Sequence, residues 1–450
     1  MEEPDGAHLQ LRYMTRFGCI GSRCEDHCCY DRRVDVDLNH YRRLVAAAQF
    51  SSAGVRSIIR DSLDVVPASK RKKTGKRFLI KHDKDRRCPF LDERRLCQLH
   101  KSFGHEMLPD ACAIYPRRLR RVGDHVELSA TPSCPELSRK LLLDADAVDV
   151  VPLAWADIQR PRIHGGMDPR DRRPFWNTAL TVRDHVVPLL ADPSISLEQR
   201  LFLTLWLSKR TNDILNKRRT SGGRGRVERE LSMLRSPKVR GEIIARFEQL
   251  RTPASIAMMI VRAVVRPSPR GVREAWNRLV GGTVDSYTRL GDVVPGLEAR
   301  VEVHDRAAAD DSQRVQMTVG EVWAEYRRRR DAIRARLGDR ADQYLRNYTI
   351  HNWFHRPPTE TKDVLTYTLR YLALQACQKF LLYSDPAVSA LLTEGADDDA
   401  LRAALDARVV DVCYQLSRHL EHGALIEYLS KLLRRAGMFS MAGGVYLIRF

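Results

Sequence analysis

The sequence has no run of about eighteen apolar residues, which is the length that a membrane-spanning helix needs. Its first residues, Met1–Gly6, have neither the basic stretch nor the apolar stretch of a secretory signal. We therefore expect a cytoplasmic protein with no membrane partner. Thiols stay reduced in that compartment, so cysteines there bind metals or react more often than they form disulfides.

The motifs of several common enzyme classes are also missing. No Gly-x-Gly-x-x-Gly follows a predicted strand, and the sequence contains neither a Gly-x4-Gly-Lys-Ser/Thr loop nor a Gly-x-Ser-x-Gly elbow. The glycines at 222, 223 and 225 have no strand before them, and we interpret residues 220–226 as a flexible connector. A common nucleotide-binding fold is therefore not expected.

Basic residues outnumber acidic ones, which gives a net charge of +19 and a pI near 9.7. Only 14 of the 76 basic residues are lysine. They are spread along the chain in short runs, such as Arg117–Arg121 and Arg327–Arg330, without the spacing of a base-reading element. Such a surface predicts an acidic partner and does not indicate a specific nucleic acid.

Cysteine is concentrated in the first third of the chain. Eight of the ten cysteines form two clusters, with spacings Cys-x4-Cys-x3-Cys-Cys and Cys-x8-Cys-x14-Cys-x21-Cys. Thiolates are soft ligands that bind zinc or build iron–sulfur clusters. The candidate metal ligands are Cys19, Cys24, Cys28, Cys29, Cys88, Cys97, Cys112 and Cys134.

The spacing leaves the kind of metal centre open. Four thiolates suffice for a four-iron (4Fe-4S) cluster or a tetrahedral zinc, and eight could hold two centres. A Cys-x3-Cys-x2-Cys radical-type motif fails, because its third position is Asp31. His27, His82, His100 and His105 lie among the cysteines, and we interpret them more readily as structural residues than as ligands. Cys377 and Cys413 are expected to be buried small hydrophobes within helices.

Periodicity and turn signals predict a mainly α fold in two parts. Residues 1–150 form a small, irregular, cysteine-rich region stapled by its metal, and it packs on a large helical domain over 151–450. Gly123-Asp124 predicts a hairpin over 119–130, and Ser133 is expected to cap a helix that runs to Leu143.

Helical signals are strong in the second part. Ser196-Leu-Glu-Gln199 is a capping box, and long helices are predicted over 321–337 and 363–382. Leucine and valine recur every three to four residues over 401–420, which indicates one buried helix face.

Three segments together resemble a known family. They are Cys19–Cys29 with the Val-Asp-Val-Asp that follows at 34–37, Cys88-Pro-Phe-Leu91, and Cys112-Ala-Ile-Tyr-Pro-Arg117. This arrangement resembles the cysteine-cluster proteins typified by the flagellin lysine-N-methylases. The x4 and x3 spacings here depart from the tighter Cys-x2-Cys-x2-Cys-Cys that is frequent in that group.

The resemblance implies transfer of a methyl group from S-adenosylmethionine to lysine ε-amines of a protein substrate, flagellin above all, with an iron–sulfur cluster on the cysteines. It marks Tyr115 and Arg117 as candidate catalytic residues that contact substrate or cofactor. In the other interpretation Tyr115 packs and Arg117 pairs with an acidic neighbour. A metal-cluster redox or storage protein and a metal-stapled interaction module remain alternative functions, and zinc remains the alternative metal.

Overall fold

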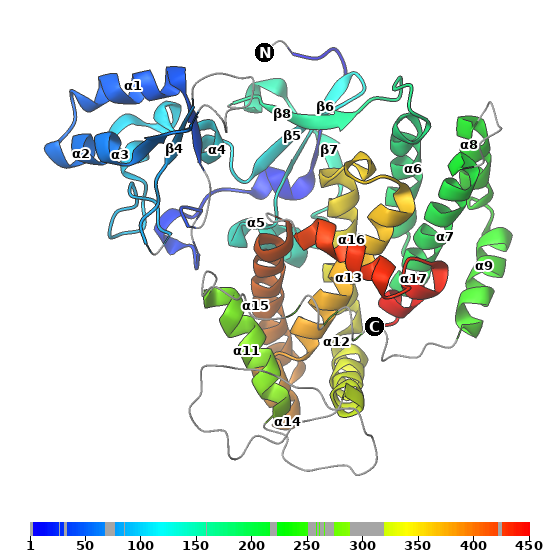
Figure 1. The fold of residues 1–450 in the computed structure, drawn as a ribbon. Coiled ribbons are helices and arrows are strands. Elements are labelled where there is room, and N and C mark those ends of the chain that lie inside the picture. The colour runs from blue at the N-terminus through cyan, green and yellow to red at the C-terminus, as the bar shows by residue number, and fades with distance from the viewer. Residues whose placement is uncertain are drawn as a thin grey trace.

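The structure is a computed structural model (Figure 1). It describes residues 3–26, 28–30, 34–67, 77–84, 86–158, 160–216, 223–250, 258, 261, 265, 274–288, 319–421 and 425–450.

A small lobe, blue and cyan in Figure 1, follows the first cysteine cluster. Its three-stranded antiparallel sheet has the order β2-β4-β3. Helix α1 begins there because Asp37 accepts hydrogen bonds from the N–H groups of Asn39 and His40. The lobe has a hydrophobic core of its own, formed by residues such as Val36, Leu44 and Phe78. Its elements are β2 (Asp35–Asp37), α1 (Leu38–Ala48), α2 (Ala53–Asp61), β3 (Leu63–Val65), β4 (Arg77–Ile80), α3 (Gln98–Phe103) and α4 (Asp110–Ala113).

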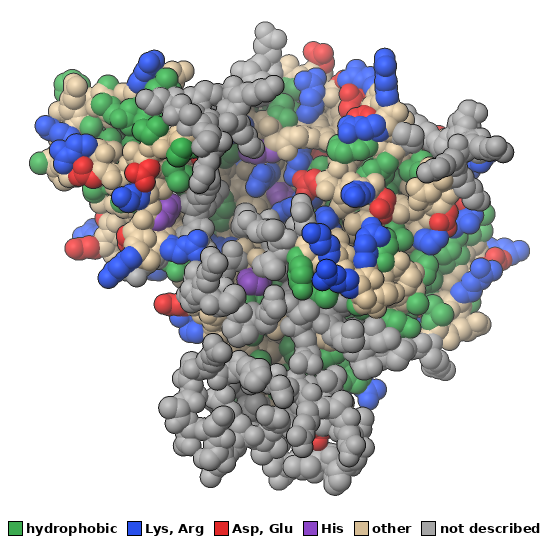
Figure 2. Space-filling model, viewed as in Figure 1, with side chains coloured by type: hydrophobic (Ala, Val, Ile, Leu, Met, Phe, Trp, Pro, Cys, Tyr) green, Lys and Arg blue, Asp and Glu red, His purple; other side chains and the backbone are tan. Residues whose placement is uncertain are grey.

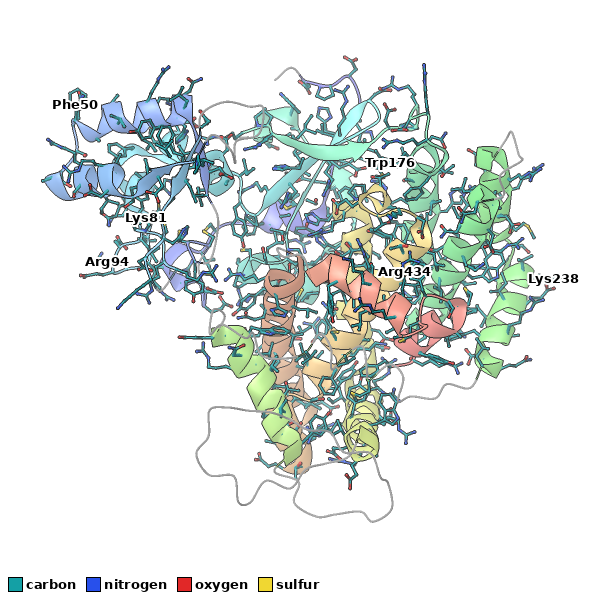
Figure 3. The ribbon with its side chains drawn as sticks, in the orientation of Figure 1. Phe50, Lys81, Arg94, Trp176, Lys238 and Arg434 are labelled. Atoms are coloured by element: carbon teal, nitrogen blue, oxygen red, sulfur yellow. The ribbon has the colours of Figure 1, made fainter. Side chains whose placement is uncertain are left out.

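Phe50 lies at the outer end of this lobe, just after α1 (Figure 3). Its side chain is 91% exposed, whereas the neighbouring Ala48 is buried. The Phe50 side chain therefore contributes nothing to the core of the lobe, which the next helix, α2, joins through Val55 and Ile59.

A five-stranded sheet joins the lobe to the helices. Its order is β7-β1-β6-β5-β8, and it consists of β1 (Leu9–Leu11), β5 (Arg117–Val122), β6 (His125–Ala130), β7 (Val150–Pro152) and β8 (Ile163–Met167). Strands β5 and β6 form the predicted hairpin, with Gly123 at a φ of 56° in the turn. Strands β1, β5 and β6 come before the domain boundary expected at residue 150, whereas β7 and β8 lie beyond residue 149, so one sheet spans that boundary. The two-part division therefore stays a prediction.

Helices make up most of the described chain, which confirms the mainly α prediction. No helix in the ranges given above is long and apolar enough to cross a bilayer. The helices outside the lobe are α5 (Pro135–Leu143), α6 (Pro174–Ala191), α7 (Leu197–Asn216), α8 (Gly223–Met233), α9 (Pro237–Gln249), α11 (Glu274–Thr288), α12 (Val319–His355), α13 (Val364–Tyr383), α14 (Pro386–Thr393), α15 (Asp398–Leu416), α16 (Leu425–Arg435) and α17 (Met441–Ile448).

Local signals predicted one helix start and parts of two longer helices. Ser196 and Gln199 exchange the two hydrogen bonds of a capping box at 3.1 and 3.3 Å. The helix predicted over 321–337 ends at a kink, because Leu337 has non-helical dihedrals inside the longer α12. The helix predicted over 401–420 is α15, which passes into a π-helical turn at Ser417–Glu421.

Two local predictions were wrong. The residue that caps α5 is Cys134, and the Ser133 hydroxyl instead meets the hydroxyl groups of Thr131 and Tyr115. The connector predicted over 220–226 is shorter than expected, because α8 begins at Gly223. Its first residues, 220–222, lie outside the described residues.

A buried polar network fixes α12 against the sheet. The Tyr13 hydroxyl accepts from the N–H of Ala130 at 2.9 Å and lies 3.2 Å from Nδ1 of His351. One turn later on α12, Nδ1 of His355 lies 2.8 Å from the Ser129 hydroxyl. The two imidazole rings stack with their centroids 4.9 Å apart. The i, i+4 spacing of these histidines places both on one face of the helix.

Charged groups complete the same interface. Arg183 on α6 binds both carboxylate oxygens of Glu127 on β6, at 2.6 and 2.8 Å, and both side chains are buried. Arg120 on β5 donates to the carbonyl of His355 and to the carboxylate of Glu360. A buried bidentate pair is costly to break from one side, so these contacts specify how the sheet meets the helices.

The buried histidines make stability depend on pH. Burial lowers the pKa of His351 to about 3, with Arg356 adding to the shift, and it lowers the pKa of His355 well below its ordinary value. In the unfolded chain both titrate near pH 6.5. Below about pH 6.5 the unfolded state therefore binds more protons, and stability falls as the pH drops toward the folded pKa values.

We expect each histidine to remove about 1.4 kcal/mol of unfolding free energy per pH unit below about pH 6. We expect the unfolding free energy of His351→Gln, measured with urea from about pH 7.5 to about pH 4.5, to fall with decreasing pH less steeply than that of the parent protein, by the same amount. Thr349→Val, a buried change on the same helix that removes no titrating group, should shift stability equally at every pH. If the unfolding free energy of His351→Gln depends on pH as steeply as that of the parent, the buried histidines are not both neutral in the folded protein.

Candidate metal centre

Short, irregular segments position the candidate ligands. Cys19 follows the 3-10 turn Arg12–Arg16, and Cys24 ends the 3-10 turn Gly21–Arg23. Cys97 and Cys134 precede the first residues of α3 and α5, while Cys112 lies within α4. All eight candidates lie in described residues, and none of the ten cysteines forms a disulfide.

The two clusters meet at Cys29 and Cys88. The backbone N–H of Cys88 donates to the carbonyl of Cys29 at 2.9 Å, and the Cys29 thiol hydrogen-bonds the thiols of Cys28 and Cys88. The bond with Cys28 lowers the pKa of Cys29. The bond with Cys88, burial and the nearby Cys112 raise that pKa, and together they outweigh the effect of Cys28.

The remaining thiols adjoin the same place. Burial raises the pKa of the Cys134 thiol to about 12 against an opposing backbone hydrogen bond, and Cys24, Cys19 and Cys28 add to the rise. Burial also raises the pKa of Cys97, and Cys28 contributes there too. We call these eight neighbouring thiols the thiol network. Cys28 adjoins Cys29, Cys97 and Cys134, so it links the thiols around Cys29 with those around Cys134.

The donor set fits a thiophilic metal by its chemistry, since thiolates bind iron and zinc strongly. Among the described residues, however, no three His, Cys, Asp or Glu side chains already stand in a metal-binding arrangement. The metal-stapled character of this region therefore stays a prediction.

Two of the four nearby histidines, His100 and His105, have other contacts. Nε2 of His105 lies 3.2 Å from the carbonyl of Ala113, and the rings of His100 and His105 meet edge to face at 6.2 Å. His82 follows β4, and His27 lies outside the described residues. Cys377 and Cys413 are buried in α13 and α15, as predicted.

Arg418 ties the thiol network to the helices. It lies in the π-helical turn after α15 and donates to the carbonyl of Ser133 at 2.8 Å. The same guanidinium forms an ion pair with Asp26, between Cys24 and Cys28, and a hydrogen bond with Tyr115. Tyr115 also lies 3.1 Å from the Ser133 hydroxyl. No sequence signal marked Arg418, because its partners lie nearly 300 residues or more away along the chain.

Arg117, the other candidate, has an unusual environment. It begins β5, and its guanidinium lies 5.2 Å from the centre of the Phe17 ring. Burial lowers its pKa, while the thiols of Cys19 and Cys134 oppose that shift. No carboxylate within the described ranges pairs with Arg117, so the acidic neighbour considered from the sequence is not found there.

Loss of the Asp26 charge should loosen the thiol network. Asp26→Asn leaves the largely buried Arg418 without its carboxylate, and we expect a loss of about 1–3 kcal/mol. Reaction of the metal-free protein with an aromatic disulfide reagent should release thiolate faster than in the parent.

Glu25→Gln is the matched control. Its ion pair with Arg139 is more exposed, at 35% for each side chain against 21% and 18% for Asp26 and Arg418. We expect it to cost less than about 1 kcal/mol. Equal effects of the two substitutions would show that Arg418 does not hold the cysteine segment.

Comparison with known proteins identifies relatives by sequence. No model of a known protein family matches the chain, and no solved structure matches it. The chain is 31% identical over 137 residues to the flagellar biosynthetic protein FliU of Salmonella muenchen, a match that covers 30% of this chain and 77% of that protein.

Two proteins called lysine-N-methylase also match over 137 residues, each across 30% of this chain. They come from Salmonella typhimurium (strain LT2), at 31% identity, and Salmonella choleraesuis (strain SC-B67), at 30%. The match spans about a third, 32%, of the length of each. On the strength of its likeness to most of FliU, the chain belongs to the cysteine-cluster family of the flagellin lysine-N-methylases.

Proposed function

We propose that this protein transfers a methyl group from S-adenosylmethionine to lysine ε-amines of a protein, with flagellin as the substrate, and that its cysteines hold an iron–sulfur cluster. The observation that carries the proposal is the thiol network, in a chain whose relatives are named lysine-N-methylases. The relatives' names support the enzyme class, and the thiol chemistry supports the cluster.

The contacts suggest how ligands would divide. Cys28, Cys29, Cys88 and Cys112 form one half of the network, and Cys19, Cys24 and Cys134 form the other, with Cys97 beside Cys28. The first grouping has the four thiolates that one centre needs, and the second reaches four only with Cys28, which also adjoins Cys134. When bound, an iron–sulfur cluster supplies an electron-transfer group and a staple for these loops. Zinc would supply the staple alone.

The lysine must lose its proton before it can attack a methyl group. A free lysine has a pKa near 10.4, and desolvation or neighbouring cations lower it. The guanidinium of Arg117 adjoins Cys19 and Cys134 and would lower the pKa of an amine that enters there, whereas Arg139 and Arg418 are paired with Glu25 and Asp26. Arg117 would also repel a charged lysine, so the amine would enter most readily in its neutral form.

The surface charge suits an acidic partner. Figure 2 shows lysine and arginine side chains scattered over the visible face, with acidic side chains between them. At a net charge of +19, this surface attracts an acidic protein over a distance near the Debye length, about 8–10 Å at moderate salt. Flagellin enters the proposal through the resemblance of the cysteine segments and through FliU, which is named a flagellar biosynthetic protein.

One observation favours the alternative of a metal-cluster redox or interaction protein. The cavity beside the thiol network, which Arg117 lines, has a volume of about 90 Å³. Binding sites for molecules the size of S-adenosylmethionine usually measure about 300–1,000 Å³. Binding of the donor to the cluster-loaded protein therefore separates the two functions.

We expect Cys24→Ser and Cys112→Ser to abolish methylation, because each removes a thiolate from one half of the network. Cys377→Ser, in which the new hydroxyl can bond to a carbonyl of α13, should retain most activity. The assay uses full-length protein purified without oxygen and follows methyl-mass increments on flagellin lysines. Iron and acid-labile sulfide in each sample report the cluster.

Two outcomes would contradict the proposal. Full activity of Cys24→Ser and Cys112→Ser would separate the cysteines from catalysis. Absence of S-adenosylmethionine binding, measured by isothermal titration on parent protein with its cluster intact, would remove the methyltransferase and favour the redox or interaction function.

A further inference from the structure

A second cavity, of about 290 Å³, lies among α6, α7, the end of α8 and the start of α9. Figure 1 places these helices on the side of the molecule away from the small lobe. Four buried leucines form the apolar wall of the cavity: Leu189, Leu207, Leu231 and Leu234. Pockets for drug-sized molecules measure about 300–1,000 Å³, so this cavity has room for a single long side chain.

One carboxylate in the lining is only partly neutralised. Asp184 on α6 accepts from two nitrogens of the Arg183 guanidinium, each at 3.3 Å. The same guanidinium binds both carboxylate oxygens of Glu127 more closely, at 2.6 and 2.8 Å. One arginine therefore serves two carboxylates, and the Asp184 side chain, which is 55% exposed, stays open to a further cation.

The other charges in the lining are balanced or exposed. Asp192 accepts from Arg240 at 2.7 Å and from the N–H and the hydroxyl of Ser194. Arg235 is exposed after the end of α8, where water and salt screen its charge. In a chain with a net charge of +19, the cavity thus offers a local site for a cation beside Asp184.

His185 supplies a second acceptor. Its Nδ1 lies 2.9 Å from the carbonyl of Thr181, which can only accept, so Nδ1 holds the proton of the neutral ring. Nε2 is then an acceptor, and it is buried without a hydrogen-bond partner in the described part of the chain. His185 lines the cavity and is an electrostatic neighbour of Asp184. A ligand that brings N–H donors would satisfy both side chains.

A carboxylate, a neutral acceptor and an apolar wall in one cavity match a primary ammonium group on an aliphatic stem. We propose that this cavity binds a lysine side chain of the protein substrate, with the ammonium group on Asp184 and Nε2 of His185 and the methylene stem along the leucines. This lysine is not the one that reacts, because the cavity lies away from the thiol network. The inference rests on the proposed function for the identity of the partner.

The test compares two small probes on full-length protein purified without oxygen. N-acetyl-lysine amide carries the amine, and N-acetyl-norleucine amide has the same stem without it. A charge-assisted hydrogen bond predicts that the parent binds the lysine probe about 10-fold more tightly, by ligand-detected NMR titration at millimolar concentrations. Asp184→Asn should lose most of this preference, because an amide cannot neutralise the ammonium charge.

Asp213→Asn is the matched control. It removes the same charge from the neighbouring α7, where Asp213 pairs with Lys209 and does not line the cavity, and it should keep the parent's preference. Equal binding of the two probes to the parent, or binding of neither, would overturn the inference and leave the proposed function standing. An unchanged preference in Asp184→Asn would overturn it as well. A lysine preference in cluster-loaded protein that does not bind S-adenosylmethionine would instead overturn the proposed function and support the cavity's preference for lysine.

Discussion

The ion pair between Asp26 and Arg418 joins the cysteine segment to the helices, and the candidate site depends on it. Cys24 and Cys28 lie on either side of Asp26, and Arg418 also donates to the carbonyl just before Cys134. The Arg418 guanidinium therefore holds both the segment that follows Cys24 and the segment just before Cys134, two cysteines of the same half of the thiol network. The other half is held by the hydrogen bond from Cys88 to Cys29, which brings the second cluster to the first.

Burial and positive charge act in opposite directions around this centre. Burial raises the pKa of Cys29, Cys97 and Cys134 and so favours thiols over thiolates in the absence of a metal. The Arg117 guanidinium acts the other way on Cys19 and Cys134. Burial also raises the pKa of Cys24, and Glu25 and Asp26 raise it further. A metal ion supplies much more positive charge than one arginine, so its binding would shift the whole network to thiolate.

The sequence predicted what local signals encode. The hairpin at Gly123, the capping box at Ser196 and the buried face of α15 each depend on residues close together in the chain. The eight cysteines stood out as one set and their thiols are neighbours, but no three of them stand in a metal-binding arrangement among the described residues. The contacts of Arg418 with Asp26 and of His351 with Tyr13 could not be predicted, because they join segments more than 300 residues apart. The helix cap predicted at Ser133 was wrong because its hydroxyl bonds to a tertiary partner, Tyr115, which competes with capping.

The central claim is that the thiol network holds a metal centre through sulfur. Iron-edge X-ray absorption of full-length protein purified without oxygen measures this directly, because the first coordination shell identifies the ligand atoms. The account predicts bound iron with a shell of sulfur atoms, at distances near the ~2.3 Å of metal–thiolate bonds, and with further iron beyond it. Protein that carries no iron, or iron bound only by oxygen and nitrogen, would contradict it.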